Sequence, residues 1–172
     1  LGERVEGGQI SIIHNAAMMT KDTADATETA SFLEVLTLNV VAPHIINQAL
    51  LPLMQPGSSV IYIGSTLSEK AVANTYSYVT SKHATVGMMR ATCQDLAGRE
   101  IHTCCVCPGF TDTQMLREHV GNDEEVLKAI AGLSTFGRLI TPDEIAGTIA
   151  YAVDNPVVNG SVINANLGQV ES

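Results

Sequence analysis

Short runs of β-branched residues alternate with longer amphipathic stretches along this chain, and this alternation limits the folds it can adopt. Four short apolar runs, each predicted as a strand, lie at residues 9–14, 58–64, 101–106 and 161–164. Three stretches with hydrophobic residues at helical spacing, each predicted as a helix, are 28–54, 75–98 and a segment that follows Thr141. Strands and helices in this order form parallel sheets with helices on both faces. We therefore predict an α/β fold with an open, mostly parallel sheet.

The size of the chain fits one domain. Its 172 residues, 45% of them apolar, are enough to bury a core, and no repeat or linker divides residues 1–172. Residues 110–140 break the alternation, because the acids Asp123, Glu124 and Glu125 lie there beside short apolar patches. We predict a lid of short helices over 110–140, with these acids on its solvated face.

Charge and hydropathy exclude several classes of partner. Eighteen acidic residues against nine Lys and Arg give a net charge of -9, which repels nucleic acid and anionic lipid surfaces. A membrane-spanning helix needs about 20 apolar residues, and Asn39, His44 and Asn47 interrupt the longest candidate. We expect neither nucleic acid nor membrane as a partner.

The cysteines indicate a reduced protein. Cys104, Cys105 and Cys107 crowd one predicted strand, which leaves only Cys93 elsewhere and makes a disulfide framework implausible. Alternation along a strand sends the three thiols to two faces, and only His102 is nearby, so we expect buried thiols and no metal site. A reducing cytoplasm is the predicted location.

Candidate catalytic residues follow the ends of the predicted strands, where ligands bind in parallel sheets. Ser65 comes directly after the second strand, and Tyr78 and Lys82 lie four residues apart on the next helix. They therefore share a helical face. A phenol with a pKa of about 10 is a poor base, but a nearby cation favours its phenolate. Tyr78 can then exchange a proton with an alcohol whose oxygen Ser65 holds, without a metal.

These residues and their neighbours resemble the short-chain dehydrogenase/reductase family over nearly the whole chain. The Asn-Ser-Tyr-Lys tetrad of that family matches Asn39, Ser65, Tyr78 and Lys82. His14-Asn15-Ala16-Ala17 is similar to its Asn-Asn-Ala-Gly turn, Pro108 to Thr113 to its nicotinamide loop, and Gly137-Arg138 with Pro142 to Ala146 to the entry of its last helix. The resemblance implies the C-terminal portion, strands 4 to 7, of a Rossmann-like fold.

The resemblance also implies a role for each residue. Tyr78 is the acid or base, Ser65 holds the substrate oxygen, Lys82 lowers the pKa of Tyr78 and binds the nicotinamide ribose, and Asn39 holds a proton-relay water. The implied cofactor is NAD or NADP, and the implied substrate is a small alcohol or carbonyl compound. The residues implied to contact the cofactor are Asn15, Ala16, Tyr78, Lys82, Pro108, Gly109, Thr111 and Thr113.

The glycine-rich phosphate-binding turn of the family is missing. No two of the 14 glycines stand two positions apart, so no Gly-x-Gly pattern exists. In the family that turn lies on strands upstream of the segment matched here. We expect that the natural polypeptide is longer and that the segment binding the adenine half of the cofactor lies outside this chain. Without its partner strand, the run Ile10 to Ile13 would form an unpaired sheet edge.

Three functional interpretations remain open. The first is an NAD(P)-dependent oxidoreductase, the second a cofactor-free interaction module with a relic site. The third is a non-redox relative such as the halohydrin dehalogenases, which place Arg where Lys82 stands. The first also implies a homodimer or homotetramer through the helices 28–54 and 75–98. Seven further residues have two interpretations: they line an apolar substrate pocket, or they take part in ordinary packing. They are Met18, Met19, Leu67, Asn74, Phe110, Met115 and Leu116.

Overall fold

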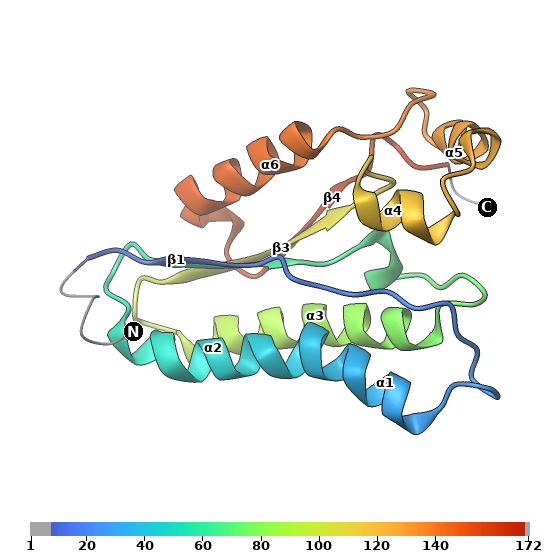
Figure 1. The fold of residues 1–172 in the computed structure, drawn as a ribbon. Coiled ribbons are helices and arrows are strands. Elements are labelled where there is room, and N and C mark those ends of the chain that lie inside the picture. Colours follow the sequence, from blue (N-terminus) through green and yellow to red (C-terminus); the bar gives the residue numbers. More distant parts are fainter. Residues whose placement is uncertain (1–7, 171–172) are drawn as a thin grey trace.

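A parallel four-stranded sheet organises the part of the chain that the computed structural model describes, residues 8–170. The strands are β1 (Ser11–His14), β2 (Ser59–Ile63), β3 (His102–Pro108) and β4 (Ser161–Ala165), and they neighbour one another in that order (Figure 1). Every pairing is parallel, with Ile12 opposite Val60 and Ile61 opposite Cys104. This arrangement confirms the predicted α/β fold with an open parallel sheet.

Helices cover both faces of the sheet. One face packs against α3 (Tyr76–Asp95) and the other against α6 (Pro142–Asp154) (Figure 1). Beside α3 runs a continuous helical stretch made of α1 (Thr29–Leu36), a π-helical segment (Thr37–Val41), α2 (Ala42–Leu50) and a 3-10 turn (Leu51–Leu53). The predicted helices 28–54 and 75–98 are therefore both present.

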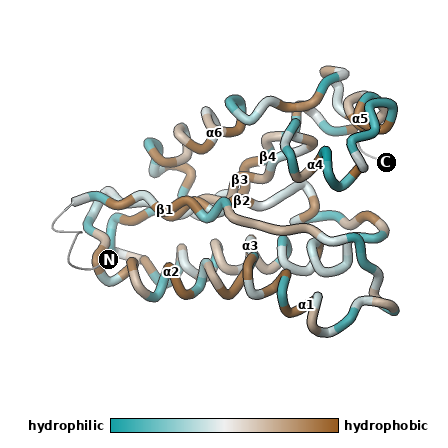
Figure 2. Tube along the Cα trace, viewed as in Figure 1, coloured by the Kyte–Doolittle hydropathy of each residue, from teal (hydrophilic) through white to brown (hydrophobic). Residues whose placement is uncertain are grey.

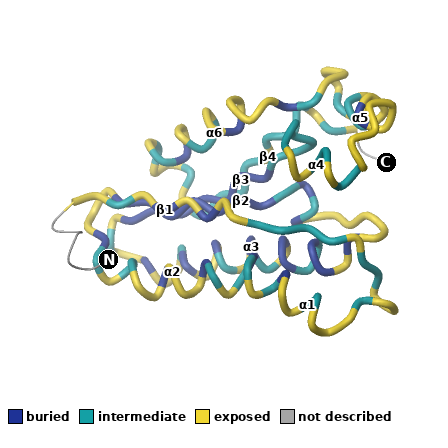
Figure 3. The backbone as a smooth tube through the Cα atoms, viewed as in Figure 1, coloured by how far each residue is buried: buried dark blue, intermediate teal, exposed yellow. Residues whose placement is uncertain are grey.

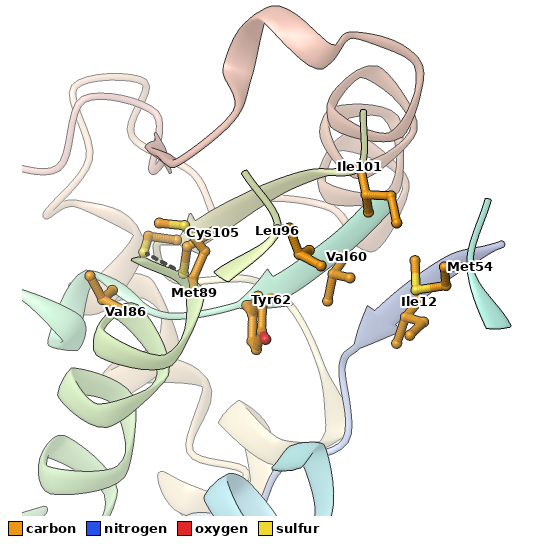
Figure 4. Close-up of a cluster of buried hydrophobic side chains, with 10 residues drawn as sticks. Ile12, Met54, Val60, Tyr62, Val86, Met89, Leu96, Ile101 and Cys105 are labelled. Carbon is orange, nitrogen blue, oxygen red and sulfur yellow. Dashed lines mark hydrogen bonds between the residues drawn. The ribbon is translucent and has the colours of Figure 1, made fainter. Parts of the chain in front are cut away.

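The sheet interior is buried from both sides, as its apolar sequence predicts. All five residues of β2 are buried, and Figure 3 shows burial concentrated along the sheet. Alternate residues serve two hydrophobic clusters, because successive side chains of a strand point to opposite faces. Tyr62, Met89 and Cys105 belong to the α3 side (Figure 4), whereas Ile61 and Cys104 belong to the α6 side.

The stretch Thr29–Leu53 is more apolar than its polar interruptions suggested. By length and composition it could cross a membrane, and few of its residues are buried, so Asn39, His44 and Asn47 do not by themselves exclude a span. These polar residues are too few to offset the surrounding apolar ones. That no membrane is a partner stays a prediction. Figure 2 shows hydrophobic positions along α2. Exposed apolar side chains of the stretch are Leu33, Val41, Ile45 and Ile46.

The predicted start of the last helix is confirmed atom by atom. The Thr141 hydroxyl accepts a hydrogen bond from the Glu144 N–H (3.3 Å), and the Glu144 carboxylate accepts one from the Thr141 N–H (2.8 Å). Residues 110–140 contain two short helices, α4 (Gln114–His119) and α5 (Glu124–Ala131). Their role as a lid stays a prediction.

Candidate active site

Three loops meet at the carboxyl edge of the sheet. The loop after β1 begins at Asn15, the loop after β2 at Gly64 and Ser65, and the loop after β3 at Gly109. Parallel strands place these exits on the same side. Helix α3 begins with Tyr76, so Tyr78 lies in its first turn, and Lys82 follows one turn later.

Asp22 fixes the N-terminus of α3, and the sequence analysis missed it. Its carboxylate accepts hydrogen bonds from the Ser77 N–H (3.1 Å) and the Ser77 hydroxyl, and its carbonyl accepts one from the Tyr76 N–H (3.3 Å). A carboxylate suits this place, because the first N–H groups of a helix lack partners and its dipole favours negative charge. No local pattern could have revealed Asp22, since it lies 55 residues before Ser77.

Ser65 lies close enough to Tyr78 for its side chain to act on the Tyr78 phenol, as the resemblance implied for a shared site. Burial raises the pKa of Tyr78, and the Ser65 side chain opposes this rise. The Ser65 hydroxyl also accepts a bond from the Leu67 N–H (3.1 Å), and the Ser65 N–H donates to Ser68 Oγ (3.1 Å). These two bonds cap the short 3-10 turn Thr66–Ser68 and fix the position of Ser65.

Lys82 is buried beneath the same edge, with 4% of its surface exposed. Its ammonium donates a hydrogen bond to the Ile63 carbonyl (2.8 Å) and lies 5.4 Å from the centre of the Tyr78 ring. Burial lowers the pKa of Lys82 to about 8. The expectation that Lys82 lowers the pKa of Tyr78 does not hold in this structure, because burial outweighs other influences and favours the neutral form of both groups.

Asn39 links the loop after β1 to α3 through its side-chain amide. Its oxygen accepts a hydrogen bond from the Met18 N–H (2.9 Å), and its nitrogen donates to the Met18 carbonyl and to Ser81 Oγ (both 2.9 Å). It lies in the π-helical segment, a local widening often found at functional sites. Both hydrogens of the amide nitrogen thus have protein partners, so the predicted water at Asn39 would have to use the second lone pair of the amide oxygen or the backbone.

Two hollows flank this arrangement. A cleft of about 610 Å³ lies between the loop after β1 and α4. It is lined by Ala17, Met18, Met19, Lys21, Gln114, Met115, Glu118 and His119. The three predicted methionines therefore line it, but the predicted Leu67, Asn74, Phe110 and Leu116 do not. A second cavity of about 10 Å³ adjoins Lys82, Asn39 and His14.

The predicted cofactor residues lie around the same edge. Asn15 and Ala16 are exposed directly after β1. Gly109 follows Pro108 at the end of β3 and packs so closely on Asn166 that an added Cβ would come within 2.9 Å of its Cα. The Thr111 hydroxyl donates to the Gly109 carbonyl (3.2 Å). The Thr113 hydroxyl accepts a bond from the Leu116 N–H (3.3 Å) and caps α4.

The electrostatic character of the site is that of neutral hydroxyls around one buried amine. Within residues 8–170, no group of three or more His, Cys, Asp and Glu side chains is placed to hold a metal ion. Hydroxyl and ammonium donors suit an oxygen atom or a ribose as ligand. The arrangement can hold a carbonyl or alcohol oxygen at Ser65 and Tyr78 and move a proton there.

Comparison with known sequences gives consistent matches. Residues 4–169 match a family model described as "Enoyl-(Acyl carrier protein) reductase". The human "3-oxoacyl-[acyl-carrier-protein] reductase" is 28% identical over 159 residues, which cover 91% of this chain and 65% of that protein. "Dehydrogenase/reductase SDR family member 6" of Xenopus laevis is 32% identical over 133 residues, covering 74% and 54%. The chain thus spans between about half and two thirds of the length of these relatives.

Solved structures share the fold at similar levels of identity. An angucycline C-6 ketoreductase, LanV, with bound NADP superposes with a TM-score of 0.86 at 27% identity, covering 98% of this chain and 65% of that one. A blue fluorescent protein from a metagenomic library, in complex with NADPH, gives a TM-score of 0.84 at 27% identity, with coverage of 92% and 64%. Both neighbours hold a nicotinamide cofactor.

Proposed function

The chain belongs to the short-chain dehydrogenase/reductase family of oxidoreductases, and from this premise we propose that it transfers a hydride between NAD(P) and an alcohol or carbonyl substrate. One observation carries the proposal: the Ser65 side chain lies beside the Tyr78 phenol and opposes the rise of its pKa, while the Lys82 ammonium lies 5.4 Å from the centre of the Tyr78 ring. A phenol, a serine hydroxyl and a buried amine at one sheet edge form an acid–base site for an oxygen atom.

The residues around the site fit the nicotinamide half of the cofactor. Among the described residues Lys82 donates one hydrogen bond, to the Ile63 carbonyl, so its ammonium retains donor capacity for a ribose hydroxyl. Thr111 and Thr113 lie on the loop after β3, and with Asn15, Ala16, Pro108 and Gly109 they would frame the nicotinamide. The bound nicotinamide supplies the two-electron chemistry of the reaction.

Ser65, Tyr78 and Lys82 would each have a different role in proton transfer. Ser65 and Tyr78 would both bond to the substrate oxygen and stabilise the charge that develops on it. Because burial raises the pKa of Tyr78, the residue stays protonated at neutral pH and can give its proton to that oxygen during reduction. Lys82, with a pKa of about 8, carries a proton that can then replace the one given up by Tyr78.

Replacing Tyr78 tests this proposal. The protein in its complete natural form would be assayed for consumption of NADPH and NADH with phenanthrenequinone and an acetoacetyl thioester as carbonyl probes. We expect Tyr78→Phe to lower kcat at least about 100-fold, because it removes the proton donor. Tyr76→Phe is the matched control, since Tyr76 is exposed and stacks on Phe32. Unchanged turnover in Tyr78→Phe would rule out the assigned role.

We also propose binding partners and a cellular compartment. The partners would be a small alcohol or carbonyl substrate and a second copy of the chain, in a homodimer or homotetramer built on the exposed apolar side chains of α1 and α2. Three of the four cysteines are buried free thiols and the fourth, Cys93, is half-buried, which supports the reducing cytoplasm as the working compartment.

A further inference from the structure

The cleft of about 610 Å³ combines an apolar part with a charged part. Its walls are the loop after β1 and helix α4, which lie beside each other in Figure 1. Met18 and Met19 from the loop and Met115 from α4 provide the apolar part, and Lys21 and His119 are among the polar residues that line it. Half of the chain's six methionines are gathered here, and flexible thioether side chains suit an apolar ligand of variable shape.

Lys21 brings to the cleft a positive charge that is free of ion pairs. Within residues 8–170, ion pairs hold Arg117 and Arg138, and none holds Lys21. Asp22, the next residue along the chain, binds the Ser77 N–H and hydroxyl with its carboxylate instead. The Lys21 ammonium is therefore available to an anion from outside the chain.

His119 lies within the influence of the same charge. Burial and the Lys21 cation both lower the pKa of His119 from its ordinary value, so the imidazole is mostly neutral at pH 7. No carboxylate of the described residues influences this pKa, although Glu118 also lines the cleft and accepts a hydrogen bond from the Gln114 amide (2.6 Å). An anion between Lys21 and His119 would accept hydrogen bonds from both and offset the repulsion that now acts on the imidazole.

The charged part of the cleft adjoins the helix turn that carries Tyr78. Lys21 precedes Asp22, whose carboxylate binds Ser77, the residue before Tyr78. The opposite wall, α4, follows the loop after β3, and that loop leaves the same edge of the sheet. A substrate whose reacting oxygen lies at Tyr78 can therefore extend between the two walls.

We propose that the substrate is an amphiphilic carbonyl or alcohol compound with an anionic oxygen group, a carboxylate or a phosphate, that binds between Lys21 and His119. The inference rests on the proposed function, because it takes Tyr78 as the place of the reacting oxygen. The apolar body of the substrate packs on the three methionines. The charged groups that line the cleft with His119 are Lys21 from the loop after β1 and Glu118 from α4. A bound anion adds a negative charge and favours the imidazolium form, so it raises the pKa of His119.

Calorimetric titration tests the preference for an anion. The protein in its complete natural form would be titrated at pH 7, in a buffer free of phosphate, with octanoate, octyl phosphate and uncharged octanol. We expect the two anions to bind at least about 10-fold more tightly than octanol, which one hydrogen bond to a charged group can provide. The tighter of the two anions identifies the group as a carboxylate or a phosphate.

Two lysine variants locate this preference. Lys21→Gln keeps a polar side chain without the charge and should lose most of the preference for the anions. Lys128→Gln is the matched control, because Lys128 is exposed on α5 and does not line the cleft, and it should bind all three probes as the wild type does.

The pKa of His119 reports where the anion binds. NMR titration of the imidazole C–H signals measures it, and the loss of one signal in His119→Gln identifies His119. We expect octanoate to raise the pKa of His119 in the wild type. Without any ligand, Lys21→Gln should also raise it, because the repelling cation is gone.

Three results would each overturn the anion site. They are equal affinity for octanol and octanoate, an undiminished preference in Lys21→Gln, and a pKa of His119 that octanoate leaves unchanged. Neither measurement requires turnover, so a failure of this site is distinct from a failure of catalysis. Anion binding together with equal turnover in wild type and Tyr78→Phe would show that the proposed function itself fails.

Discussion

Lys82 carries its ammonium group into the interior, and the fold bears a free-energy cost for it. The side chain is 4% exposed and its ammonium donates a hydrogen bond to a backbone carbonyl, and no carboxylate of the described residues influences its pKa. Burying an ammonium without an anionic partner disfavours the charged form. The lowered pKa of Lys82, about 8 against an ordinary 10.5, expresses this cost.

Removing this charge should stabilise the protein while inactivating it. We expect Lys82→Met to raise the free energy of unfolding at pH 7 by about 1–3 kcal/mol, the order of magnitude of the pKa shift. Between pH 8 and 10.5 the unfolded chain binds more protons at this lysine than the native one, so wild-type stability rises with pH there. The advantage of Lys82→Met should therefore vanish across that range.

Urea unfolding of the wild type and of Lys82→Met, at pH 7 and at high pH, would measure how the free energy of unfolding of each protein changes with pH. Lower stability of Lys82→Met at pH 7 would show that the hydrogen bond to Ile63 and the contact with the Tyr78 ring outweigh desolvation. Tyr76→Phe again serves as the control, because Tyr76 is exposed and uninvolved in the buried charge.

Among the individual site residues, only some features could be predicted from the sequence. The four-residue spacing of Tyr78 and Lys82 predicted a shared helical face, because helix geometry is local. The direction of the Tyr78 pKa was predicted wrongly, since it depends on burial under the sheet edge. The hydrogen bonds Asp22–Ser77, His14–Asn47 and Asn47–Tyr62 join residues 55, 33 and 15 positions apart, and no local pattern encodes them.

At the scale of elements, local sequence patterns predicted the structure correctly where the stabilising contacts are themselves local. Helix α6 begins where Thr141, Pro142 and Glu144 predicted, because a capping box is complete within four residues. The helical stretch 28–54 was also predicted, but its π-helical turn at Thr37–Val41 was not. That turn carries Asn39, whose amide bonds reach Met18 and Ser81, so its cause is tertiary.

The capping box of α6 gives a prediction about one helix end. Thr141→Ala removes the hydroxyl that accepts from the Glu144 N–H and should lower the free energy of unfolding by about 1 kcal/mol. Thr148→Ala is the matched control, because the Thr148 hydroxyl only bonds back to the Glu144 carbonyl within the helix and its loss should be neutral or slightly stabilising. Thermal unfolding compares the two, and equal melting temperatures would contradict a stabilising cap.

At the scale of the molecule, packing in the interior does not account for the exposed apolar side chains of α1 and α2. Leu33, Ile45 and Ile46 are 54%, 56% and 41% exposed. The whole stretch Thr29–Leu53 is long and apolar enough to cross a membrane. Exposed apolar side chains gathered on one helical stretch are typical of contact with a protein or a membrane. We propose a second copy of the chain as the occupant, because the apolar faces of two copies can bury one another.

A single charge within this surface tests the assembly. We expect Ile45→Glu to shift the protein to a smaller species in light-scattering chromatography, because a carboxylate would be buried without a partner at the interface. Val157→Glu is the control, since Val157 is 83% exposed on a 3-10 turn after α6 and away from α1 and α2. An unchanged mass for Ile45→Glu would contradict an interface on α2. Binding of the wild type to neutral lipid vesicles, lost in Ile45→Glu, would instead identify a membrane as the partner of this surface.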